Sequence, residues 1–261
     1  MLRLTACLLL GLVLSTGSRA QSNIILTNGE WPPYLGEMLP YNGTASRIIS
    51  EAFASQGMQV RWDFHAWDRA FELAQQGLRD GTAVWSSTPE REHDFFISAP
   101  VLRSGQFFYS LRERAFDWQQ MDDLEGLQVG LTRSYNYGQA LQEAARQGLI
   151  GSRTANNDLT NLRRLLRGQI DIFPINPVVA DSLLQTHFTP EERERLVQHP
   201  KPIRQYTLHL LLSRKVLGNQ RTLERFNNGL EQLWRDGRMQ RYLQDFERPD
   251  GLQAIPPSAN R

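Results

Sequence analysis

Cysteine is nearly absent from this chain of 261 residues, in which Cys7 is the only one. Cys7 lies in a segment typical of a secretory signal peptide. The segment has a basic Arg3, an apolar stretch over residues 4–14 and a Ser-Arg-Ala cleavage motif at residues 18–20. We expect cleavage near Ala20, so that residues 1–20 are the signal peptide. A mature chain without cysteine excludes disulfides, a cysteine nucleophile and thiolate metal sites.

A dominant charge is also missing. The chain has 29 basic and 28 acidic residues, and removal of Arg3 and Arg19 with the signal peptide leaves 27 against 28, a net charge of −1. There is no basic stripe and no basic amphipathic run, so the sequence predicts neither a nucleic-acid partner nor a membrane-surface partner. No second long apolar run follows residue 20, and we expect a soluble protein of the periplasm.

Metal-ligand spacing is missing as well. The chain has five histidines, and none of them falls into a spacing that suits a metal ion. We therefore expect no metal site and no cofactor.

Apolar periodicity up to residue 85 predicts a β-α-β-α-β order. The expected strands are 24–27, 60–64 and 83–85, and the expected helices are 44–56 and 67–76. This order is typical of a largely parallel sheet covered by helices.

A second α/β unit and a return strand follow. The expected strands are 106–111, 127–131, 170–173 and 206–212, and the expected helices are 137–146, 159–167, 177–184, 190–197, 220–235 and 238–246. Two similar units indicate two lobes that share a cleft, where ligands of open α/β sheets bind beyond the carboxyl ends of the strands.

Residues 86–91 combine a helix start with an arginine. Ser87 or Thr88 can cap the helix, Pro89 suits its first turn, and free backbone N–H groups at such a start attract anions. The guanidinium of Arg91, one turn further on, matches a carboxylate in two hydrogen bonds. The segment therefore predicts a site for a small carboxylated ligand, with an ion pair between Arg91 and Glu90 or Asp94 as the structural alternative.

An ordered set of short motifs covers the chain from about residue 24 to residue 246. The motifs are Trp31-Pro32-Pro33-Tyr34, Trp67-Asp68-Arg69, residues 86–91 with Asp94-Phe95, Leu124-Glu125-Gly126-Leu127-Gln128-Val129-Gly130, Gly168-Gln169-Ile170-Asp171, Ser213-Arg214-Lys215 and Leu233-Trp234-Arg235-Asp236-Gly237. The set resembles the bacterial extracellular solute-binding proteins of family 3, the periplasmic receptors of polar amino acid ABC transporters.

The resemblance implies an α/β, two-lobed periplasmic binding protein fold of type II with two crossover hinge strands. Family members close around the ligand by hinge motion. The implied divisions are residues 21–108 for the first part of lobe 1, 112–203 for lobe 2, 207–250 for the second part of lobe 1 with the C-terminal helices, and 251–261 for a disordered tail.

The resemblance also implies site residues. Arg91 matches the carboxylate clamp, Ser86 the small ligand-contacting residue before it, and Tyr34 the aromatic residue that packs on the ligand. The loop Ser134-Tyr135-Asn136 matches the helix start that supplies donors from lobe 2, although it departs from the usual Gly-Thr-Thr type of turn. A helix N-cap is the structural alternative for Asn136.

Three further aromatic residues and one amide complete the candidates. Trp31 could contact the ligand or pack only within its loop, and the core and the cleft are alternatives for Trp67 and Trp85. Asn176 stands where family members carry the aspartate that holds the ligand ammonium. A neutral amide accepts a hydrogen bond but cannot neutralise an ammonium, so a carboxylate with a neutral or differently placed second group becomes an option.

The expected function is a non-enzymatic, monomeric receptor for a small carboxylated solute, such as an amino acid, that delivers it to the permease of an ABC importer. One alternative is a receptor that feeds a sensor. Another is a dehydratase for cyclic prephenate-like acids, in which Glu30 would be the nearest acid. A third is a protein-interaction module that binds no small ligand.

Overall fold

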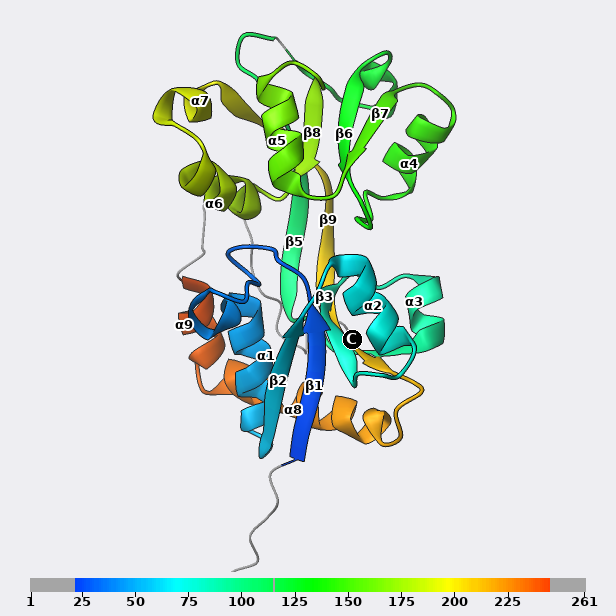
Figure 1. Cartoon of the computed structure of the whole chain (residues 1–261), viewed down its shortest axis with the longest axis vertical. Coiled ribbons are helices and arrows are strands. Elements are labelled where there is room, and N and C mark those ends of the chain that lie inside the picture. The colour runs from blue at the N-terminus through cyan, green and yellow to red at the C-terminus, as the bar shows by residue number, and fades with distance from the viewer. Residues whose placement is uncertain (1–21, 115, 245–261) are drawn as a thin grey trace, which may run out of the picture.

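The computed structural model describes residues 22–114 and 116–244 (Figure 1). The signal peptide expected over residues 1–20 and the tail expected over residues 251–261 lie outside these residues. Among the helices of the described ranges, none has the length and apolarity that crossing a bilayer would need.

Lobe one, the lower part of Figure 1, has a sheet flanked by helices. Its elements are β1 (Ser22–Asn28), α1 (Thr44–Ala54), β2 (Met58–Phe64), α2 (Trp67–Gln75), β3 (Gly81–Trp85), α3 (Pro89–Asp94), β4 (Phe95–Ile97), α8 (Asn219–Arg235) and α9 (Arg238–Gln244). Strand β1 pairs in parallel with both β2 and β3. Helix α1 buries Ile48, Ile49, Ala52 and Phe53 at the spacing that its sequence predicts.

Lobe two, the upper part of Figure 1, is the second α/β unit. Its elements are β6 (Gln128–Thr132), α4 (Gln139–Arg146), β7 (Gly151–Ala155), α5 (Asp158–Leu166), β8 (Ile172–Ile175), α6 (Pro177–His187) and α7 (Pro190–Glu194). Strand β6 pairs in parallel with β7 and β8. The carboxyl ends of β6 and β7 therefore meet at one edge of the sheet, next to the starts of α4 and α5.

Two long antiparallel strands run from one lobe into the other (Figure 1). They are β5 (Leu102–Leu111) and β9 (Leu196–Ser213). The strand order is β2-β1-β3-β9-β5-β8-β6-β7, and β4 also pairs with β9. Because β9 and β5 lie in the middle of this order, they are the crossover strands that connect the lobes.

Strand β9 is much longer than the sequence predicts. The helix expected over 190–197 is wrong beyond residue 194, because Leu196 pairs with Leu111 and Val197 with Ser110. Pairing with β5 therefore overrides the local helical pattern. The sequence also misses β4, which has three residues, and β7, whose middle is exposed Ser-Arg-Thr without an apolar run.

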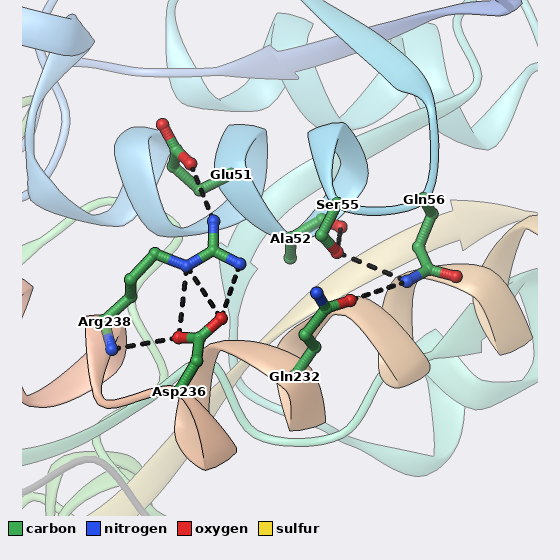
Figure 2. A network of polar contacts seen from close by, with 7 residues as sticks. All are labelled: Glu51, Ala52, Ser55, Gln56, Gln232, Asp236 and Arg238. Carbon is green, nitrogen blue, oxygen red and sulfur yellow. Dashed lines mark hydrogen bonds and ion pairs between the residues drawn. The ribbon is translucent and has the colours of Figure 1, made fainter.

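A polar network joins α1 to the C-terminal helices of lobe one (Figure 2). The Arg238 guanidinium donates to Asp236 at 2.7 Å and reaches the Glu51 carboxylate on α1 at 3.3 Å. One turn away, the Gln56 amide donates to Gln232 on α8 at 3.5 Å. The last helices thus complete lobe one on the face that α1 covers.

Candidate functional site

A cavity of about 60 Å³ lies between the two lobes. From lobe one come Trp31, Trp67, Val84, Trp85, Ser86 and Arg91. From lobe two come Ser134, Tyr135 and Asn136, and the crossover strands add Gln106, Tyr206 and Leu208. Two larger hollows, of about 700 Å³ and about 400 Å³, share Ser134 and Tyr135 with this cavity. The space next to the cavity is therefore in the range that small-molecule ligands occupy.

The start of α3 brings Arg91 to the cavity. Thr88 is the N-cap, and its hydroxyl accepts a hydrogen bond from the Arg91 backbone N–H at 3.3 Å. Pro89 occupies the first turn, as the sequence predicts. The Ser87 hydroxyl does not form the alternative cap; it donates to the Glu92 carboxylate.

The guanidinium of Arg91 makes its hydrogen bonds within the described residues through one nitrogen. Its Nη1 donates to the Ser86 carbonyl oxygen at 2.7 Å and to the Ser86 hydroxyl at 2.9 Å. The Trp85 ring centre lies 4.7 Å from the guanidinium carbon. Within residues 22–114 and 116–244, no ion pair and no hydrogen bond from Nη2 or Nε is found for Arg91, and the alternative pairing with Glu90 or Asp94 does not form.

Burial lowers the pKa of Arg91 to about 10. The group thus keeps its charge at neutral pH, although it is half-buried. A half-buried charged fork with one edge held by Ser86 and the other edge open is suited to receive a carboxylate in two hydrogen bonds.

A β-bulge in β3 sets the side chains that surround Arg91. The register against β9 shifts between Ala83 and Trp85, and Val84 has φ 67°, in the left-handed region. A β-branched residue there costs about 1–3 kcal/mol and persists only when the surrounding structure enforces it. Val84, Trp85 and Ser86 consequently all line the cavity, whereas strict alternation would turn every second residue away.

The loop after β6 forms the lobe-two side of the cavity. Ser134 also has a positive φ, 64°, and its hydroxyl donates to the Asp68 carboxylate at the start of α2 in lobe one. The Tyr135 hydroxyl donates to Asp158 at 2.7 Å. The loop therefore touches lobe one directly, and the described conformation is one in which the lobes meet.

Asn136 has a local partner and a partner on a crossover strand. Its Oδ1 accepts from the Gly138 backbone N–H at 2.9 Å and from Arg204 Nη1 at 2.9 Å. Gly138, not Asn136, is the N-cap of α4. The Arg204 guanidinium lies 4.6 Å from the Tyr206 ring centre, so a second cation lies directly behind two residues that line the cavity.

Tyr34 and Asn176 lie outside the lining of this cavity. Tyr34 is buried and stacks on Trp31 with ring centres 4.8 Å apart, and burial raises the pKa of its hydroxyl while a hydrogen bond with the Asn176 side chain opposes that rise. The Asn176 amide also caps α6 by accepting from the Val179 N–H at 3.0 Å and donates to Ser104 at 3.1 Å. The structure therefore places these two predicted site residues in contact with each other across the lobes.

Trp67 combines both of the roles considered for it. It packs edge-on against Trp85, with ring centres 5.1 Å apart, and it also lines the cavity. Its indole N–H donates to the Glu30 backbone carbonyl at 3.3 Å. Seven of the nine predicted site residues thus line one cavity.

Gln106, Tyr206, Leu208 and Val84 also line the cavity and are not among the predicted site residues. Three of them lie on β5 and β9, where the sequence gives only an alternating strand pattern. The signal that could have found them is the expected position of these strands between the lobes, since a crossover strand passes the cleft. No group of three or more potential metal-ligating side chains is found within the described residues.

Asp158 is a buried carboxylate beside the cavity and provides a pH-dependent prediction. It accepts from Thr132 at 2.6 Å and from Tyr135 at 2.7 Å, and burial raises its pKa above the ordinary 3.8. The folded chain therefore holds the proton of Asp158 more tightly than the unfolded chain does. The contribution of this group to the free energy of unfolding is complete below pH 3.8 and is lost as the pH rises through the raised pKa of the folded state.

Replacement of Asp158 with asparagine should remove this dependence. We expect the melting temperature of Asp158→Asn to increase relative to that of the wild type as the pH rises from about 4 to 7. Thermal unfolding at a series of pH values measures the difference, with the exposed Asp122→Asn as the control. Parallel curves for the wild type and Asp158→Asn would show that the carboxyl has an ordinary pKa.

The fold and the inter-lobe site define a two-lobed solute-binding protein of the α/β periplasmic binding class. The chain belongs to the bacterial extracellular solute-binding proteins, family 3, whose sequence pattern matches residues 24–247. The fold and the resemblance predicted from the sequence are therefore confirmed.

Solved structures share this fold at low sequence identity. A histidine kinase sensor domain with similarity to periplasmic binding proteins has a TM-score of 0.76 and 20% identity, covering 91% of this chain and 100% of that one. An ancestral arginine-binding protein bound to arginine has a TM-score of 0.70 and 18% identity, covering 86% and 98%. The substrate binding protein of an amino acid ABC transporter has a TM-score of 0.69 and 15% identity, covering 86% and 99%. A search of curated proteins found no match.

Proposed function

We propose that this protein is a monomeric periplasmic receptor that captures a small carboxylated solute, an amino acid or a related acid, between its lobes and delivers it to the permease of an ABC importer. The observation that carries the proposal is the state of Arg91. A half-buried guanidinium that lines an inter-lobe cavity, has no ion pair in the described chain and is held only through Nη1 is poised for an external carboxylate.

Contacts between the lobes support capture by closure. The Ser134 hydroxyl of lobe two bonds to Asp68 of lobe one, and the Tyr34 and Asn176 side chains meet across the same cleft. These contacts must open before a solute can enter, and they re-form around it. Closure of this kind is how a receptor presents a loaded state to its permease.

Sensing is a second candidate for the use of the closed state. The similarity to a histidine kinase sensor domain, at a TM-score of 0.76, supports it. In that role the same ligand-closed receptor would report to a signalling partner instead of a permease.

An enzyme of the dehydratase type has less support. Its candidate acid, Glu30, is exposed, accepts from the Glu37 N–H at 2.9 Å, and lines the larger hollow and not the cavity that contains Arg91. A general acid needs contact with the reacting group. We therefore propose binding without turnover, and turnover of prephenate by the purified protein would contradict this.

Thermal unfolding of residues 21–261 with a panel of solutes tests the proposal. The panel contains amino acids, dicarboxylates, polyamines and cyclic acids, and each acid is matched with its neutral amide. A ligand at a hundred times its dissociation constant stabilises the folded chain by about 2.7 kcal/mol. We expect one class of acids, and none of the matched amides or polyamines, to raise the melting temperature. A panel without any active acid would overturn the carboxylate receptor.

A further inference from the structure

Two buried polar atoms of the cavity have no hydrogen-bond partner within the described residues. They are the amide oxygen Oε1 of Gln106 and the indole nitrogen Nε1 of Trp31. The Gln106 residue is 2% exposed and Trp31 is 7% exposed. Both line the cavity that Arg91 lines. Since unpaired buried polar groups are unfavourable, an unpaired acceptor and an unpaired donor on two residues that line one cavity indicate where a bound solute makes its bonds.

The charges around the cavity restrict what can bond to Gln106. Arg91 lines the cavity, Arg204 contacts its lining residues Asn136 and Tyr206, and no aspartate or glutamate is among the lining residues. An ammonium placed here would face Arg91, with Arg204 behind the lining, and would find only neutral oxygens and no carboxylate in the lining. An amide oxygen accepts a hydrogen bond equally well from an uncharged N–H, which carries no charge to be neutralised.

Acidic side chains do occur nearby, but in the two neighbouring hollows. Glu90 and Asp94 line the space of about 400 Å³, which Arg91 also lines. Glu30, Asp68 and Asp158 line the space of about 700 Å³ on the other side of Trp67 and Tyr135. Asp68 already accepts from Ser134, and Asp158 accepts from Tyr135 and Thr132. Ser134 and Tyr135, which line both the cavity and the larger hollow, thus donate to Asp68 and Asp158 of the larger hollow.

We propose that Gln106 determines ligand specificity, by accepting a hydrogen bond from an uncharged N–H of a small carboxylate. This inference rests on the proposed function, because Arg91 holds the carboxylate of the same solute. The Trp31 indole N–H donates to an acceptor of the solute. The preferred class is therefore an anionic acid with a neutral N–H, not a free α-amino acid with its ammonium.

Three probes of similar size isolate the second group of the solute. Pyrrole-2-carboxylate has an uncharged ring N–H, furan-2-carboxylate has no donor at that position, and L-proline has a charged amine. Flat rings also suit a cavity walled by Trp31, Trp67 and Trp85. We expect calorimetric titration to give roughly tenfold tighter binding for the pyrrole than for the furan acid, and the weakest binding for proline.

Two substitutions of Gln106 separate a ligand contact from a structural role. In Gln106→Met the acceptor is gone at similar volume, so the pyrrole acid should bind roughly tenfold more weakly and the furan acid as before. The melting temperature without ligand should stay the same or rise, because an unpaired buried oxygen is removed. In Gln106→Glu the new carboxylate should shift preference from the pyrrole acid to proline. Gln59→Met, exposed on β2, is the matched control.

The outcomes distinguish this inference from the proposed function. Equal binding of the pyrrole and furan acids, or unchanged selectivity in Gln106→Met, overturns the role of Gln106 and leaves the carboxylate receptor intact. If proline or another free amino acid binds the wild type most tightly, the role of Gln106 is overturned as well. The ammonium would then bind in the hollow of about 700 Å³ that Asp68 and Asp158 line. If no acid binds at all, both proposals fail together.

Discussion

Arg91→Ala should reduce binding of the carboxylated solute by a factor of about a hundred or more. The guanidinium has one edge held by Ser86 and the other available for two charge-assisted hydrogen bonds. Each hydrogen bond to a charged group contributes roughly 1.5–3 kcal/mol, so loss of two removes about 3–6 kcal/mol of binding free energy. Isothermal titration with the acid that stabilises the wild type most measures the loss.

The controls for this prediction test the geometry of the fork. Arg91→Lys keeps the charge but not the planar pair of donors, so binding should fall between that of the wild type and Arg91→Ala. Arg69→Ala removes an exposed arginine of α2, which among residues 22–114 and 116–244 pairs only with Glu72, and should leave binding unchanged. Wild-type affinity in Arg91→Ala would show that the carboxylate binds elsewhere.

Gly229→Ala should destabilise the folded chain by about 1–3 kcal/mol, against the usual direction for a helix. Glycine to alanine inside a helix normally stabilises by about 1 kcal/mol. Here a Cβ on Gly229 of α8 would lie 2.0 Å from the Ala52 carbonyl oxygen and 2.9 Å from the Ser55 hydroxyl, both on the α1 side of the contact (Figure 2). The helices would have to separate, and the packing of Phe53 on Phe226, with ring centres 4.9 Å apart, would loosen.

Urea unfolding of the ligand-free protein measures this effect as a shift of the midpoint. Asn228→Ala is the matched control, because it changes the neighbouring exposed residue of the same helix and should stabilise slightly through helix propensity. If both variants gain stability, α1 and α8 do not approach as closely as described.

The sequence predicts the local parts of the site well. The helix start at Thr88 and Pro89 and the placement of Arg91 follow from capping preferences, which act within one turn. Alternation could not decide between core and cleft for Trp85, because the bulge at Val84 breaks the period of two. The bulge depends on the pairing of β3 with β9, two strands that are far apart in the chain, so no local pattern predicts it.

Contacts that depend on the whole fold could not be predicted from the sequence. Gln106 follows the same strand pattern as its neighbours, and only the meeting of the lobes makes its unpaired oxygen part of a cavity. The resemblance assigns Tyr34 and Asn176 to the ligand, and in the structure the two side chains are hydrogen-bonded to each other. No local pattern in either segment predicts that these two side chains come into contact.

The place of β9 in the sheet has a consequence for the order of events during synthesis. β9 lies between β3 and β5, yet it is the last strand along the part of the chain that the structure describes. From the time β3 leaves the ribosome until Leu212 and Leu211 arrive to pair with Gly81 and Thr82, one edge of β3 has no native neighbour. An open edge invites pairing with other strands. The open edge of β3 therefore has to be protected, or to remain unfolded, until synthesis has passed Leu212.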